Sequence, residues 1–141
     1  MLKGAGTGVD IEVYVRELVR LCPGISAIWL IGSRANGTAR PTSDYDLVVF
    51  TDRGLFESMR THGSVRNQEI DLFIVFGSNG DFETPWGEKK GNLKDWEWSQ
   101  ESPGTANYRS VKFMPDKPGS KTGVIKTERL KAKKLYPADK P

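Results

Sequence analysis

Three short apolar runs, separated by polar segments of limited length, constrain the fold of this chain more than any other feature. They occupy residues 27–31, 47–50 and 70–76. Each predicts a strand, and the first is typical of a strand with both faces buried. An amphipathic segment at residues 7–24 predicts a helix before the first run, and a weaker one at 52–63 predicts a helix between the second and third. This order predicts an α+β fold with an α/β-type core.

The second half of the chain differs in composition: it is first rich in turn-forming residues and then contains two segments typical of strands. Residues 93–102 and 105–115 read as two strands joined at Pro103 and Gly104, a plausible hairpin. We therefore expect one domain and a separate end. The predicted ranges are a domain over 1–116, with a core at 8–76 and a β-rich extension at 86–116, and a C-terminal tail over 117–141.

The tail is strongly basic although the net charge of the whole chain is only +3. Eight lysine and arginine residues stand there against Glu128 and Asp139 alone. Lysine-rich ends of this kind are commonly solvated, and we expect a partly disordered segment. Contact with nucleic acid or another polyanion is the alternative.

The scarcity of two residue types excludes several classes of chemistry. One cysteine, Cys22, excludes an internal disulfide and a zinc cluster, and one histidine, His62, excludes catalysis by a histidine pair. We expect both to be structural. No apolar run is long enough for a membrane span, and the first ten residues lack the apolar core of a signal peptide. A cytoplasmic protein without a membrane partner is expected.

Two aspartates at the head of the second apolar run form the chain's most unusual local feature. Asp44 and Asp46 in "DYDLVVF" point to the same face of a strand, because strand side chains alternate. Like charges at that spacing repel each other unless a cation lies between them. Asp71 heads the third run in the same manner. Taken singly each of these acids would be a solvated surface residue; together they predict a divalent-metal site.

The glycine-containing turn after the first apolar run resembles a phosphate-binding loop, but it matches neither the P-loop nor the dinucleotide-binding motif. Gly32 ends the run, and Gly37 follows, but Thr38 stands where a P-loop needs lysine. The glycine pattern of a dinucleotide site appears nowhere after a strand.

The stretch "GSRANGTARPTSDYDLVVF" resembles a motif of the nucleotidyltransferase superfamily that includes DNA polymerase β, and most of all its small, single-domain bacterial members. The resemblance covers about residues 8–76 and implies a palm-like mixed sheet with flanking helices. It rests on Gly32, Ser33, Arg34, Gly37, Ser43, Asp44 and Asp46, with Asp71 following.

The resemblance also implies a chemistry. Asp44, Asp46 and Asp71 would be the catalytic acids and would hold two Mg²⁺ (or Mn²⁺) ions about 3.5–4 Å apart. The nucleotide would lie on Gly32, Ser33, Arg34 and Ser43. The donor would be an NTP, with ATP preferred, and AMP would pass to a hydroxyl of an acceptor such as a partner protein, an antibiotic or an RNA end.

One departure from the simplest family members leaves the acceptor unassigned. Those members carry a helical region that supplies the acceptor pocket, whereas the chain after Phe76 is β-rich. The alternative function is therefore a catalytically weak nucleotidyltransferase-like module that binds a partner protein or RNA. The three intact aspartates favour the enzyme.

Overall fold

The computed structural model describes residues 9–61 and 63–137, so His62 lies outside the described residues. The helices are α1 (Ile11–Leu21), α2 (Ser33–Asn36), α3 (Arg53–Thr61) and a 3₁₀ turn, η1 (Gly63–Val65). The strands are β1 (Ala27–Ile31), β2 (Tyr45–Phe50), β3 (Ile70–Val75), β4 (Asp81–Glu83), β5 (Lys90–Asn92), β6 (Ser99–Gln100), β7 (Thr105–Pro115) and β8 (Gly123–Tyr136). The three apolar runs are strands, as predicted.

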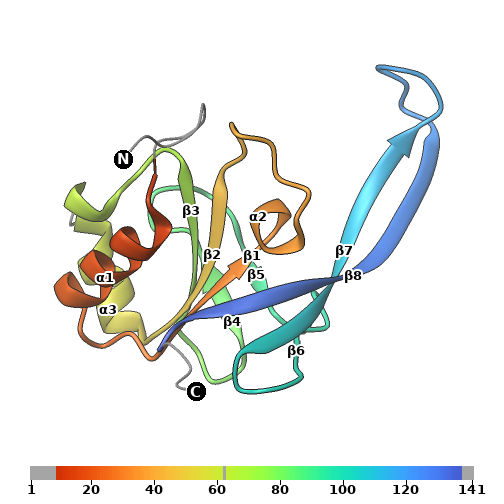
Figure 1. Ribbon diagram of the computed structural model, residues 1–141. Coiled ribbons are helices and arrows are strands. Elements are labelled where there is room, and N and C mark those ends of the chain that lie inside the picture. Colours follow the sequence, from red (N-terminus) through yellow and green to blue (C-terminus); the bar gives the residue numbers. More distant parts are fainter. Residues whose placement is uncertain (1–8, 62, 138–141) are drawn as a thin grey trace.

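All eight strands form one mixed sheet in the order β5-β4-β3-β2-β1-β8-β7-β6 (Figure 1). Only β2 and β3 run parallel, and the crossover between them contains α3; every other neighbouring pair among the described strands is antiparallel. The mixed α+β fold predicted from the sequence is confirmed.

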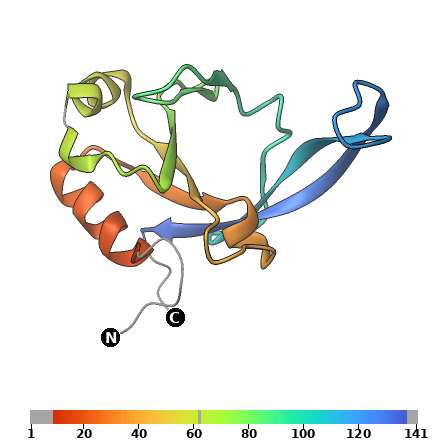
Figure 2. The same ribbon diagram turned by 90° about the horizontal axis from the view of Figure 1, so that it is seen from above.

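Helices α1 and α3 cover one face of this sheet (Figures 1 and 2). Helix α1 begins at Asp10, whose side chain accepts a hydrogen bond from the Val13 N–H at 3.2 Å. Its buried side presents Leu18, and α3 presents Phe56 and Met59, to apolar side chains of β1, β2 and β3. No helix among the described residues is long and apolar enough to cross a membrane.

The opposite face of the sheet is covered by the sheet itself, which curls so that its two ends approach each other. Trp96 shows the contact, because its ring lies 4.7 Å from that of Phe82 in β4 and 6.1 Å from that of Tyr108 in β7. The predicted strand at 93–102 is reduced to β6. Trp96 and Trp98 lie instead in a turn that begins at Leu93, where Glu97 has a φ of 51°. Both rings pack against the apolar cluster on this face.

The C-terminal residues are not the disordered tail that we expected, because β8 occupies residues 123–136 and pairs with both β1 and β7. Leu130 and Ala132 alternate along β8 and face the core, and Ala132 is fully buried. The lysines between and beside them concealed this two-residue period. The strand forms because it buries one apolar face, while the ammonium groups of the lysines on its other face remain in water.

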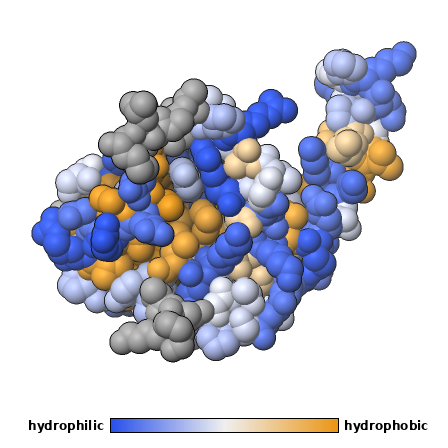
Figure 3. All heavy atoms as spheres, viewed as in Figure 1, coloured by the Kyte–Doolittle hydropathy of each residue, from blue (hydrophilic) through white to orange (hydrophobic). Residues whose placement is uncertain are grey.

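Beyond the body of the sheet, β7 and β8 continue as a two-stranded projection that we call the arm, residues 110–128 (Figures 1 and 2). Among the strands that the structure describes, those of the arm pair only with each other, and apolar side chains near its tip are exposed. Ile125 is 68% exposed and Val124 67%. Figure 3 shows this apolar patch surrounded by hydrophilic residues.

Candidate active site

The pairing of β2 with β3 brings two of the predicted acids side by side. The parallel register sets Asp46 directly opposite Asp71, and both side chains leave the sheet on the face away from α1 and α3. Asp46 is half-buried and is also the partner of Ile31 at the end of β1. Asp44 precedes β2 and is exposed. The register therefore places the Asp46 and Asp71 carboxylates together at this end of the sheet, whereas Asp44, one residue before β2, is not positioned by strand alternation.

The environment of Asp46 disfavours its charged form. Burial is the largest cause, and the charge of Asp71 and hydrogen bonding to its carboxyl group add to it, so that the pKa of Asp46 rises to about 6. Asp44 contributes in the same direction, and the ammonium group of Lys89 opposes the shift. This part of the sheet is thus a concentrated negative site that a cation would stabilise.

Gly32 lies directly against Asp46 and has no room for a side chain. A Cβ atom there would come within 2.7 Å of Oδ2 of Asp46. The φ of Gly32 is also +75° with ψ at −158°, a conformation that L-residues avoid. Glycine is therefore required at this position by both the backbone and its neighbour, and the chain can turn from β1 into α2 with its backbone next to the acids.

Three residues that sequence reasoning missed, Asn36, Tyr108 and Lys131, hold this turn in place. The Gly32 N–H donates to the Tyr108 hydroxyl at 2.8 Å. The Asn36 amide group donates to the carbonyls of Gly32 at 2.9 Å and Lys131 at 3.0 Å, and its oxygen accepts from the Lys131 N–H at 2.9 Å. Tyr108 and Lys131 come from β7 and β8, so no local pattern around Gly32 could have identified them.

Tyr108 is also part of the electrostatics of the site. Its pKa is raised, first by burial and then by the charge of Asp46, while hydrogen bonds with Gly32 and Asn36 act in the opposite direction. The phenol is therefore held neutral and close to the acids.

Arg34 and Ser43, both predicted to bind the nucleotide, are brought together by the structure but are engaged with the loop before β2. The Arg34 guanidinium donates to the Ser43 carbonyl at 2.8 Å and to the Pro41 carbonyl at 3.0 Å, and it lies 4.5 Å from the centre of the Tyr45 ring. The Ser43 hydroxyl accepts from the Arg40 N–H at 2.9 Å. These contacts hold the loop that delivers Asp44, while Ser33 is the first residue of α2.

The described residues contain no group of three or more His, Cys, Asp or Glu side chains placed to hold a metal ion. The adjacent pair Asp46 and Asp71 nevertheless fits a hard divalent cation. Mg²⁺ and Mn²⁺ prefer carboxylate oxygens and need few of them from the protein, and the raised pKa of Asp46 marks the charge that such an ion would neutralise. Asp44 acts on this pair through its charge.

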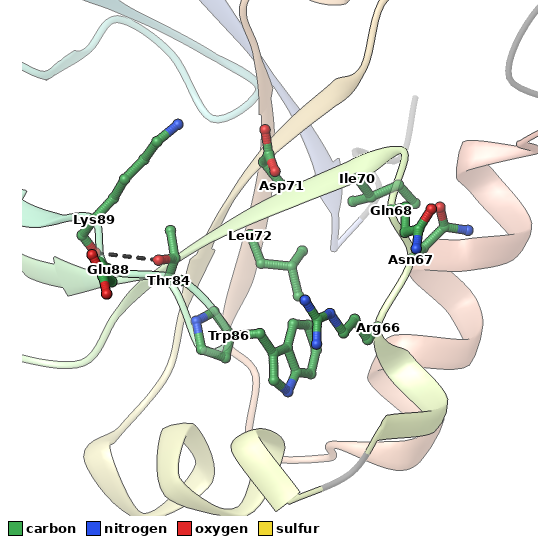
Figure 4. Close-up of a pocket in the computed structure, with 12 residues that line it drawn as sticks. Arg66, Asn67, Gln68, Ile70, Asp71, Leu72, Thr84, Trp86, Glu88 and Lys89 are labelled. Atoms are coloured by element: carbon green, nitrogen blue, oxygen red, sulfur yellow. Dashed lines mark hydrogen bonds between the residues drawn. The ribbon is translucent and has the colours of Figure 1, made fainter.

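A pocket of about 320 Å³ adjoins Asp71 on the side away from Asp46 (Figure 4). It lies between β3 and the loop that joins β4 to β5. Asp71 and Lys89 point to one side of it, and Trp86 and Arg66 lie on the other. Arg66 is 5.8 Å from the centre of the Trp86 ring. This pocket could not be predicted from the sequence, because its two walls are distant along the chain.

Comparison with known proteins agrees with this geometry. A family model described as a nucleotidyltransferase domain matches residues 11–103. The matched residues include the three aspartates and the turn at Gly32, but they end before Tyr108. No curated protein and no solved structure matched the chain.

Proposed function

The chain belongs to the nucleotidyltransferase domain family, and we propose that it transfers a nucleoside monophosphate, preferably AMP from ATP, to a hydroxyl acceptor. The observation that carries this proposal is the register of β2 and β3, which sets Asp46 opposite Asp71 beside the turn at Gly32. A resident Mg²⁺ or Mn²⁺ would neutralise the charge that develops on the phosphoryl oxygens.

Each part of the site then has a role. Asp46 and Asp71, with Asp44 at the rim, would hold the metal and orient the reacting groups. Gly32 allows the triphosphate to approach the backbone closely, and Ser33 offers an N–H and a hydroxyl to its outer phosphates. Arg34 and Ser43 would act on the nucleotide through the loop that they hold, since their polar groups already have partners in it.

One observation favours the second candidate, a catalytically weak module that binds a partner or RNA. The Gly32 N–H, which would otherwise face the phosphates, already donates to Tyr108. A nucleotide that needs this N–H would have to displace the phenol. Turnover therefore has to be measured directly.

The test is transfer of label. The protein is incubated with each of the four α-labelled NTPs, Mg²⁺ and a lysate of its host, and labelled products are separated. We expect ATP to label a specific acceptor, and Asp44→Asn and Asp46→Asn to abolish the label. Each substitution should remove several kcal/mol of the metal-dependent stabilisation of charge in the transition state, which corresponds to a rate loss of about a thousandfold or more.

Asp95→Asn, an exposed acid in the turn before β6, is the matched control and should label at the wild-type rate. Absence of metal-dependent label with all four nucleotides would favour the binding module. Label that persists in both variants would show that Asp44 and Asp46 are not the catalytic acids.

A further inference from the structure

Strand β3 has an open edge beside the proposed catalytic acids. Its pairing with β4 is confined to Ile74 and Val75, and within residues 9–61 and 63–137 no strand pairs with the first half of β3 on that side. The chain leaves the line of β4 after Glu83, and Pro85 has no N–H with which to continue the ladder. The space left between this edge and the departing loop is the pocket of Figure 4.

The hydrogen bonds of β3 show which of its backbone groups face this space. Tyr45 N–H donates to the Glu69 carbonyl, and Thr51 N–H donates to the Val75 carbonyl, both at 2.9 Å. Alternate residues of a strand direct their N–H and C=O groups to the same side. The odd-numbered residues, Asp71 included, therefore bond toward β2.

The even-numbered residues bond in the opposite direction. Phe76 N–H donates to the Asp81 carbonyl at 3.1 Å, on the β4 side. Leu72 has the same parity and directs both its N–H and its C=O into the pocket. No backbone or side-chain group among the described residues forms a hydrogen bond with them there. A strand edge with free donors and acceptors is a template for another extended chain.

We propose that this edge binds an extended peptide segment of a partner protein, and that the peptide residue opposite Asp71 carries the hydroxyl that receives the nucleotide. The inference rests on the proposed function and names its acceptor class. Residues directly opposite in a sheet share a face, with Cβ atoms about 4.5–5.5 Å apart. A serine, threonine or tyrosine at that position is thereby delivered to Asp71.

The wall of the pocket opposite Asp71 determines which residues fit on either side of the hydroxyl residue in such a peptide. Side chains before and after the hydroxyl residue point to the other face, where Leu72, Trp86 and Arg66 lie. An apolar or aromatic residue fits against Trp86, and an acidic residue fits beside Arg66, which is exposed. The pocket therefore selects a hydroxyl residue between apolar or acidic neighbours.

The arrangement also suits the direction of the reaction. Gly32 and Ser33 follow β1, Asp46 is in β2 and Asp71 is in β3, so the triphosphate and the peptide approach from opposite sides of Asp46. Phosphoryl transfer needs the attacking and leaving oxygens roughly in line. The peptide oxygen bonds to the α-phosphorus, the bond from that phosphorus to the bridging oxygen breaks, and pyrophosphate leaves with the electron pair. The hydroxyl proton passes to the Asp71 carboxylate.

The test uses a library of seven-residue peptides with a central serine, threonine or tyrosine, incubated with the full chain, Mn²⁺ and α-labelled ATP. The best-labelled peptide is then resynthesised with one N-methyl group at each backbone position in turn. Strand pairing predicts an alternating pattern, in which methylation at every second position lowers labelling about tenfold, the value of one good hydrogen bond. Labelling that is insensitive to methylation overturns the inference.

A second measurement probes the wall. Arg66→Glu should replace the preference for an acidic flanking residue with one for a basic residue, with ATP affinity unchanged. Arg16→Glu, at an arginine on α1 that is also exposed, is the matched control and should leave the peptide preference unaltered.

The outcomes separate this inference from the proposed function. ATP·Mn²⁺ binding is measured independently by calorimetry. If ATP binds and no peptide is labelled, or if a hexa-adenylate RNA with a free 3′-hydroxyl is labelled in place of the peptides, the peptide edge is wrong and nucleotidyl transfer stands or falls on its own test. If ATP does not bind, the proposed function fails first, and the inference fails with it.

Discussion

This one sheet contains two like-charged pairs whose members stand directly opposite each other on neighbouring strands, one pair on parallel strands and the other on antiparallel strands. In β2 and β3, Asp46 stands opposite Asp71, and in the arm, Lys112 stands opposite Lys126. The acids are half-buried, with apolar core on both faces of the strands behind them. The lysines are exposed, and none of the other described strands pairs with the arm beside them.

The difference shows that burial, rather than strand pairing, decides what a like-charge pair does. Repulsion between exposed lysines is weakened by water and salt, so the arm can tolerate it. Burial, and then the charge of Asp71, raise the pKa of Asp46, so that a cation would stabilise this pair. Two like charges placed directly opposite each other thus form a candidate metal site in the body of the sheet and a solvated surface in the arm.

The largest expected effect compares a glycine from each region. Gly32 and Gly119 both have positive φ, but a Cβ at Gly32 would meet Asp46, whereas a Cβ at Gly119, in the turn of the arm, would meet nothing within 4 Å. Gly32→Ala should lower the free energy of unfolding by about 2–4 kcal/mol, from strain and overpacking together. Gly119→Ala should cost about 1–2 kcal/mol. Chemical denaturation measures both, and equal losses would contradict the predicted contact with Asp46.

A smaller effect follows from the pKa of Asp46. Because burial and the charge of Asp71 raise this pKa to about 6 in the folded protein from the 3.8 of an unperturbed aspartate, the folded state holds the proton more tightly. The resulting stability is present at pH 4 and is lost as the pH rises through 6. We expect metal-free wild type to lose about 2 kcal/mol relative to Asp46→Asn over this interval, a value reduced for partial exposure.

Denaturation curves at pH 4 and pH 7, with and without Mg²⁺, test this prediction. Added Mg²⁺ should restore the stability of wild type at pH 7 and leave Asp46→Asn unchanged. Lys112→Gln, which alters the other like-charge pair, should follow the wild-type pH dependence. An identical pH dependence in wild type and Asp46→Asn would show that this carboxyl is not strained.

The smallest effect on stability concerns the arm and the proposed contact with nucleic acid. Lys112→Gln with Lys126→Gln should change the free energy of unfolding by no more than about 0.5 kcal/mol, because both side chains are exposed. If the arm contacts phosphates, the dependence of log affinity on log salt for a single-stranded RNA should flatten by about 0.7 per lost contact. Lys94→Gln, outside the arm, is the control, and an unchanged slope in the double variant would remove the arm from nucleic-acid binding.

These residues also show how far sequence reasoning could reach. Asp44, Asp46 and Gly32 belong to one local motif, and strand alternation follows from covalent geometry, so their proximity could be predicted without a structure. Asp71 could be placed because it heads the adjacent apolar run. Arg34 could not, since whether a guanidinium faces a phosphate or a loop carbonyl depends on a tertiary contact.

Other features required the whole fold. Leu130 and Ala132 alternate as in a strand, but the lysines around them led to the prediction of a solvated tail. The strand is apparent only once its pairing with β1 and β7 is known. Trp86 and Lys89 become site residues because Pro85 ends the β3–β4 ladder and turns the loop aside. Proline marks such an end in sequence, yet which edge it opens depends on strand order.

The hydrogen bond from Gly32 to Tyr108 joins the recognisable motif to a strand beyond it. A fragment cut at residue 103, where the family match ends, would retain all three aspartates. It would lose the partner of the Gly32 N–H, the bonds between Asn36 and Lys131, and the strand beside β1. The family match and the structural unit therefore end at different residues in this protein. The family match ends at residue 103, whereas a fragment that keeps the contacts of the Gly32 turn must extend through β8.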